Sequence, residues 1–167
     1  YRFQQQTIQA LNMIRSGDLG RIELARAGFH FHLNRPDDVR WNSDLGGGAL
    51  WDVGCYTISF VRAIFGAKPQ VKSASLSWTD RAVDRAATAT LVFPNGGQAF
   101  VSCGFDGPLG GVVRHATITG DKGSLSLSFE NSIEEEDRAV FQWLQAPGSP
   151  VKSVPVGCGN GFALEAD

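Results

Sequence analysis

Two side chains that can exchange protons stand four residues apart in the run GGGALWDVGCY, residues 46–56. They are Asp52 and Tyr56, and in a straight helix this spacing places both on one face. A tyrosine, whose pKa is ordinarily about 10, can take up and release a proton when a nearby cation stabilises the phenolate. Plainer interpretations remain open. The helix dipole favours any first-turn carboxylate by roughly 0.3 to 1 kcal/mol, and a tyrosine can be a half-buried core residue.

The three glycines that open this run, Gly46, Gly47 and Gly48, need an explanation because glycine loses more backbone freedom on folding than any other residue. At a helix N-terminus the unpaired N–H groups and the positive end of the dipole face outward, and missing side chains let a ligand approach the backbone. Alternatively, the glycines form a tight loop with positive φ between elements packed too closely for a Cβ. The sequence alone favours neither interpretation.

The three histidines are the other group with chemical potential. His30 and His32 lie two residues apart on one face of an expected strand, and with His115 they suggest a shared metal ion. Because no carboxylate or cysteine at metal-like spacing accompanies them, we expect histidines of a sheet face and no metal.

The elements that must position these residues are two helices and about eight strands. Apolar spacing predicts an amphipathic helix over 3–15, closed by Gly17, with Phe3, Thr7/Ile8, Leu11 and Ile14 as its apolar positions. It predicts a second helix from Ala49 to about Phe65, ended by Gly66. A strand is expected within 22–33, followed by a loop at 34–48 that lacks periodicity. Further strands are expected at 70–79, 86–93, 98–105, 112–119, 123–129, 139–145 and 151–156, with hairpin turns at 94–97 and 120–123.

This order of elements implies an α+β fold. Its large, mainly antiparallel sheet would carry the helices on one face and leave the other face open. The open face would hold small polar side chains rather than a second core: Ser73, Ser75, Ser77, Thr88, Thr90, Ser124, Ser126 and Ser128. Such a face is either solvated or paired with a partner.

Composition narrows the class of protein. The 167 residues, 43% of them hydrophobic, suit one globular domain. A net charge of -2 without a long basic run argues against nucleic acid as a partner, and the acidic run at 134–137 fits a solvated turn. Cys55, Cys103 and Cys158 form no C-x-x-C pair, which favours a reducing, cytoplasmic setting. Neither a signal peptide nor an apolar run near the roughly 20 residues of a membrane span is present, so we expect no membrane partner.

Several stretches together resemble a known family. They are SGDLGRI at 16–22, RWNSDLGGGALWDVGCYTISFVRAIFG at 40–66, KPQVKSA at 68–74 and ITGDKGSLSLSF at 118–129. They are similar to the C-terminal domain of the oxidoreductases named for glucose-fructose oxidoreductase and inositol dehydrogenase (Gfo/Idh/MocA), and the likeness runs through almost the entire chain. The most specific part is GGGAL-x-D-x-G-x-Y. Its final tyrosine resembles the dihydrodiol dehydrogenase, xylose dehydrogenase and glucose-fructose oxidoreductase branch, whereas inositol dehydrogenases have histidine there.

The resemblance implies the substrate and oligomerisation domain, 1–167, of an oxidoreductase that uses NAD or NADP to remove a hydride from a sugar, polyol or diol hydroxyl. A Rossmann domain should precede it, but no G-x-G-x-x-G is present, GCGNG at 157–161 has the composition of a turn, and the chain opens at Tyr1 without methionine. We therefore expect part of a longer enzyme, inactive alone, whose cofactor is bound mainly by the missing domain.

The resemblance also implies roles for individual residues. Tyr56 would transfer the proton, and Asp52 would orient the tyrosine or form a hydrogen bond with it. A lysine of the missing domain would be the cation that lowers the pKa of the tyrosine. Gly47 and Gly48 would let the cofactor ring and the substrate approach the helix start. From their place in the loop before the glycines, Arg40 and Trp41 are candidates for contact with substrate hydroxyls or the cofactor phosphate, although a surface arginine and a packing tryptophan explain them at least as well. The expected partners are a small-molecule substrate and a second copy of the chain bound through the open sheet face. The alternative is a non-catalytic module for ligand binding or dimerisation.

Overall fold

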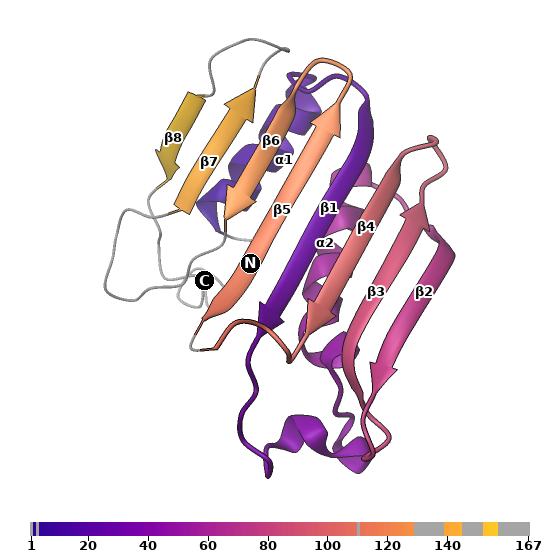
Figure 1. The fold of residues 1–167 in the computed structure, drawn as a ribbon. Coiled ribbons are helices and arrows are strands. Elements are labelled where there is room, and N and C mark those ends of the chain that lie inside the picture. The colour runs from indigo at the N-terminus through magenta and orange to yellow at the C-terminus, as the bar shows by residue number, and fades with distance from the viewer. Residues whose placement is uncertain (1, 3, 110, 129–138, 145–151, 157–167) are drawn as a thin grey trace. The chain divides into compact units, whose positions relative to one another are not determined.

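The computed structural model describes residues 2, 4–109, 111–128, 139–144 and 152–156. The chain forms two compact units, one of Tyr1–Ala25 with His115–Asp167 and the other of Arg26–Arg114. The described residues form an α+β fold in which two α-helices accompany mainly antiparallel strands (Figure 1), which confirms the predicted class. The acidic run, Cys158 and GCGNG lie outside the described residues.

The element order follows the sequence prediction closely. The elements are α1 (Gln5–Ser16), β1 (Ile22–Phe31), 3-10 turns at Val39–Trp41 and Ser43–Leu45, a π-helical turn (Leu50–Gly54), α2 (Cys55–Phe65), β2 (Gln70–Trp78), β3 (Asp84–Val92), β4 (Gln98–Gly104), β5 (Val112–Gly120), β6 (Ser124–Ser128), β7 (Ala139–Leu144) and β8 (Lys152–Val156). Both expected hairpin turns are present. The Phe93 N–H bonds the Gly97 carbonyl at 2.8 Å, and the Gly120 N–H bonds the Gly123 carbonyl at 2.9 Å.

In the Arg26–Arg114 unit, β2, β3 and β4 pair antiparallel in that order. Alternation sends Ala87 of β3 and its partner Cys103 of β4 to a buried side, and Figure 1 shows α2 behind β4. The other side carries the expected small polar residues in register: Ser73 opposite Thr90, and Ser75 opposite Thr88. Phe100, paired with Thr90 on this side, is 43% exposed.

The helix expected from Ala49 to Phe65 is present, but it is not a straight α-helix throughout. Its first turn, Leu50–Gly54, is π-helical, and the α-helix proper begins at Cys55. A Cβ on Gly54 would lie 2.9 Å from the Cys103 sulfur, so this glycine lets the helix start pack tightly on β4. At the other end, Phe65 stacks on Phe93 with ring centroids 4.0 Å apart, and Gly66 ends the helix at φ 62° as predicted.

In the other unit, β5 to β8 pair antiparallel in chain order. Leu125 and Leu127 of β6 are buried, and the alternating Ser124, Ser126 and Ser128 take the opposite side, as expected. Helix α1 buries Gln6, Thr7 and Ala10, whereas Ile8, assigned to its apolar set by the sequence pattern, is 36% exposed. Gln6 is satisfied there because its amide donates to the Ser128 carbonyl at 3.3 Å. Within the part of the chain that the structure describes, no helix has the length and apolar character to cross a membrane.

Candidate active site

The loop at 34–48 has more order than its irregular sequence pattern suggests. Asp38 caps its first 3-10 turn, Val39–Trp41, by accepting the backbone N–H of Arg40 at 3.0 Å. Asn42 caps the second, Ser43–Leu45, by accepting the backbone N–H of Asp44 at 2.9 Å. Capping by Asp and Asn satisfies N–H groups that a short turn cannot pair internally. The loop therefore presents Arg40 and Trp41 from a fixed turn.

The glycine run is a tight loop that closes onto this turn. Gly46 and Gly48 have φ of 73° and 113°, which favours glycine. The N–H of Gly47 donates to the Asn42 carbonyl and that of Gly48 to the Arg40 carbonyl, both at 2.9 Å. A Cβ on Gly47 would lie 2.5 Å from the Arg40 oxygen. These contacts favour the packing interpretation of the run.

The start of the helix is held by a buried carboxylate that the sequence pattern did not single out. Asp84, at the first position of β3, is 5% exposed, and its Oδ2 accepts the backbone N–H of Leu50 at 2.7 Å. A Cβ on Gly48 would collide with its Oδ1. Asp84 thus satisfies one of the unpaired donors of the helix start and leaves room only for a glycine at 48.

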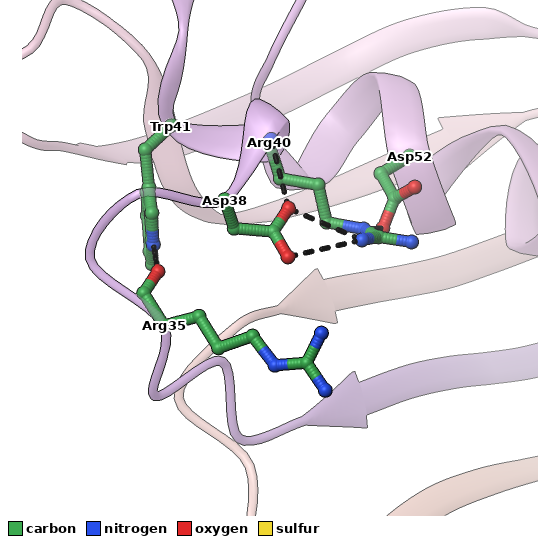
Figure 2. A network of polar contacts seen from close by, with 5 residues as sticks. All are labelled: Arg35, Asp38, Arg40, Trp41 and Asp52. Atoms are coloured by element: carbon green, nitrogen blue, oxygen red, sulfur yellow. Dashed lines mark hydrogen bonds and ion pairs between the residues drawn. The ribbon is translucent and has the colours of Figure 1, made fainter.

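A chain of charged groups joins the loop to the helix start (Figure 2). Arg40 donates from Nε to Asp52 Oδ2 at 2.7 Å and from Nη1 to Asp38 Oδ1 at 3.2 Å. The hydrogen bond to Asp52 is the main cause of the raised pKa of Arg40, and the backbone N–H of Arg40 is the main cause of the lowered pKa of Asp38. The sequence analysis made Arg40 a candidate for contact with substrate. In the structure its side chain lies between the carboxylates of Asp38 and Asp52.

Tyr56 lies one turn after Asp52 in the sequence and is 45% exposed. Its ring packs against Phe29 of β1, with centroids 6.0 Å apart. On the same Phe29 ring lies the guanidinium of Arg114, 5.2 Å from the centroid, and burial lowers the pKa of this arginine. Within the described ranges, the buried Arg114 Nε has no hydrogen-bond partner. The sequence analysis did not identify Phe29 or Arg114 as neighbours of Tyr56.

Trp41 occupies the other side of the turn that carries Arg40. Its ring meets Phe105 edge-on at 5.1 Å, and its Nε1 donates to the Arg35 carbonyl at 3.0 Å. It lines an open cavity of about 730 Å³, together with apolar residues such as Leu33 and Leu109 and charged residues such as Asp80 and Arg85. Two other residues that line the cavity are bonded to each other, since Arg81 donates to the Pro36 carbonyl. Volumes of roughly 300 to 1,000 Å³ are typical of small-molecule sites.

The histidines and cysteines have separate surroundings. His30 Nε2 lies 3.0 Å from Ser102 Oγ, and its Nδ1 lies 3.9 Å from Asp106 Oδ1. Among the residues that the structure describes, no group of three or more His, Cys, Asp and Glu side chains is placed to hold a metal. Cys55 and Cys103 are free thiols, and burial raises the pKa of both, that of Cys103 to about 11. Neither thiol is therefore activated as a nucleophile at neutral pH.

Comparison with known proteins gives a family and a fold. The model of the GFO/IDH/MocA C-terminal domain matches residues 7–126. The chain is 34% identical over 109 residues to D-xylose 1-dehydrogenase (NADP(+)) 2 of Haloferax volcanii, covering 65% of the chain and 33% of that protein. It is 33% identical over 128 residues to trans-1,2-dihydrobenzene-1,2-diol dehydrogenase of Danio rerio, covering 75% of the chain and 37% of that protein.

The same architecture occurs in solved structures at lower identity. The 3-ketoreductase KijD10 from Actinomadura kijaniata, in complex with NADP and TDP-benzene, matches with a TM-score of 0.84 and 23% identity over 96% of this chain and 48% of that one. Aldose-aldose oxidoreductase from Caulobacter crescentus, complexed with glycerol, matches with a TM-score of 0.82 and 23% identity over 99% of this chain and 48% of that one. The chain thus spans about a third of these curated relatives and about half of these solved proteins.

Proposed function

Because the chain belongs to the Gfo/Idh/MocA family through its C-terminal domain, we propose that it is the substrate-binding and self-associating part of an NAD(P)-dependent oxidoreductase. The substrate is a sugar, polyol or diol that is oxidised or formed at one hydroxyl carbon. The observation that carries this proposal is the helix start that holds Asp52 against Arg40 and presents an exposed Tyr56 one turn later. The names of the xylose and dihydrodiol dehydrogenases among its relatives support the substrate class.

The residues of this chain handle the proton. A bound nicotinamide supplies the acceptor or donor of the hydride. As the hydride leaves the carbon, Tyr56 takes the hydroxyl proton, and it returns the proton in the reverse direction. Asp52 accepts a hydrogen bond beside the reacting oxygen and orients it. The cavity lined by Trp41 takes a further part of the substrate in this proposal, because it offers apolar and charged groups together; Arg40, Asp52 and Tyr56 lie outside its lining.

The glycine run does not supply hydrogen-bond donors for the phosphates of the cofactor in this proposal. The N–H groups of Gly47, Gly48 and Leu50 are already bonded to protein oxygens, so they offer no donors to a cofactor phosphate. Contact of Gly47 or Gly48 with a nicotinamide ring needs no free N–H and stays a prediction. The phosphates of NAD or NADP therefore require groups other than these three amides.

We expect the isolated chain to bind neither NAD nor NADP tightly. It has no phosphate-binding glycine fingerprint, and the N–H groups of Gly47, Gly48 and Leu50 at the start of its second helix are bonded to protein oxygens. Isothermal calorimetry with each dinucleotide measures this. Dissociation constants near the micromolar range for either one would contradict the assignment of cofactor binding to another domain.

We also expect the chain to self-associate through the small-residue face of β2 to β4, where Ser75 and Thr88 lie opposite each other. Small side chains permit flat, close packing, and a stable interface buries roughly 1,600 Å² in total. Thr88→Arg places a charge at the centre of this face and should weaken the dimer. Ala63→Arg adds the same charge at an exposed position of α2 and should not. Sedimentation of the three proteins over a concentration series tests this, and a wild-type chain that stays monomeric at high micromolar concentration would leave the face solvated.

A further inference from the structure

We propose that Asp38 and Arg40 are positioning residues that fix the Asp52 carboxylate through one oxygen and leave its other oxygen for the substrate hydroxyl. The role of that second oxygen rests on the proposed function. The positioning itself rests on the loop and the helix start alone.

Asp38 sets the orientation of Arg40. Its carboxylate accepts both the backbone N–H of Arg40, at 3.0 Å, and Nη1 of the same residue, at 3.2 Å. Its side chain is 11% exposed, against 28% for Asp52 and 39% for Arg40, so it is the most enclosed group of the three. Two bonds from one carboxylate to the backbone and the side chain of one residue restrict the rotamer of that residue. Arg40 is therefore held before it meets Asp52.

Arg40 then holds one oxygen of Asp52. Its single Nε–H donates to Oδ2 at 2.7 Å, a short charge-assisted bond. Figure 2 shows the other oxygen of Asp52 directed away from the guanidinium. An arginine that engaged a carboxylate through two nitrogens would occupy both oxygens, whereas this side-on contact occupies one. The geometry therefore fixes the carboxylate and keeps a lone acceptor available.

Backbone hydrogen bonds also connect Arg40 to Asp52, by way of Gly48. The Gly48 N–H donates to the Arg40 carbonyl at 2.9 Å, and the Asp52 N–H donates to the Gly48 carbonyl at 3.1 Å. Asp52 is thus tied to Arg40 through main chain and side chain together. Partly exposed ion pairs contribute little to stability, so the effect of this arrangement is expected on the orientation of Asp52 rather than on folding.

The loop offers a matched control for charge. Arg35 lies in the same loop and contributes a minor part of the lowered pKa of Asp38. Figure 2 draws no bond from its guanidinium to Asp38 or Asp52. Arg35→Gln removes the same charge as Arg40→Gln without removing the contact to Asp52.

The first experiment needs no catalytic activity. The Nε–H of Arg40 is followed by ¹⁵N NMR in the chain, and its hydrogen exchange is compared in wild type, Asp38→Asn and Arg35→Gln. Asn at 38 keeps the shape and the cap of the turn, so the fold is retained. We expect exchange to quicken about tenfold or more in Asp38→Asn, because a neutral amide holds the guanidinium more weakly than the carboxylate does, and to stay unchanged in Arg35→Gln. Unchanged exchange in Asp38→Asn would overturn the positioning role of Asp38.

The second experiment measures turnover in the full-length enzyme. Asp38→Asn should lower kcat/KM about tenfold, since an error of about 1 Å in a reacting group can cost roughly 10²-fold, with the melting temperature and the Arg35→Gln control unchanged. Arg40→Lys should retain more activity than Arg40→Gln, because an ammonium still reaches one carboxylate. Wild-type turnover in an Asp38→Asn enzyme whose Arg40 exchanges faster would refute the inference. A wild-type enzyme that oxidises no sugar, polyol or diol would refute the proposed function. The hydrogen exchange of the Arg40 Nε–H would still show whether Asp38 positions Arg40.

Discussion

Tyr56→Phe in the full-length enzyme should lower kcat by roughly 10² to 10⁴-fold, the range for loss of a general acid-base group. The substitution removes only the hydroxyl and keeps the ring that packs on Phe29. Tyr56 is 45% exposed, so the substitution is not made in the buried core. The melting temperature and the affinity for the dinucleotide should therefore stay close to wild type. Steady-state kinetics with thermal denaturation of the same preparations measures both.

Two further variants separate a role of Tyr56 in proton transfer from a role in packing or from a role of Asp52 as the base. Phe29→Leu alters the packing beneath the tyrosine ring without removing a titratable group, so it should affect stability more than the chemical step. Asp52→Asn should cost less than Tyr56→Phe if Asp52 only orients the reacting oxygen, and more if Asp52 is itself the base. A Tyr56→Phe enzyme within about threefold of wild type, far short of an acid-base loss, would remove Tyr56 from the mechanism.

The second large effect is expected on stability. Gly48→Ala should destabilise the chain by about 2 to 5 kcal/mol, the sum of backbone strain at positive φ and of overpacking. Gly48 has φ of 113°, and a Cβ there would meet the buried carboxylate of Asp84. The collision displaces the group that accepts the Leu50 N–H, so the helix start that carries Asp52 should loosen as well.

Gly46→Ala is the matched control for this prediction. Gly46 also has positive φ, at 73°, but nothing lies within 4 Å of the position that its Cβ would take. Only the backbone strain remains, which amounts to about 1 to 2 kcal/mol. Urea denaturation of both variants separates the two contributions. Equal losses in stability would show that the contact with Asp84 does not restrict residue 48.

Local signals in the sequence were enough to predict most of the fold. Hairpin turns at 94–97 and 120–123 and the terminal glycines Gly17 and Gly66 act over a few residues, and all four are found where they were expected. The π-helical first turn was not predicted, because it forms where Gly54 packs on Cys103 and Leu50 bonds Asp84, both distant in sequence. The burial of Gln6 in place of Ile8 likewise depends on a carbonyl 122 residues away.

The candidate site was predictable in part. The family motif identified Asp52 and Tyr56, and the structure adds the partner of the first, Arg40, and the ring beneath the second, Phe29. Asp38 carried a local signal that the sequence analysis did not use, since an aspartate immediately before a short helical turn is a typical cap. Asp84 carried none, because nothing near it in the sequence shows that its partner is a helix start 34 residues earlier.

The first 3-10 turn of the loop, Val39–Trp41, places two adjacent residues in different surroundings. Arg40 faces the carboxylate at the helix start, and Trp41 faces the cavity and Phe105. If the proposed function holds, mutations that reshape the cavity wall can accumulate while the reacting groups keep their places. Substrate range and chemical step are then free to evolve separately, and a library of substitutions at Trp41, Leu33 and Leu109 is the natural starting point for redesigning the specificity of this protein.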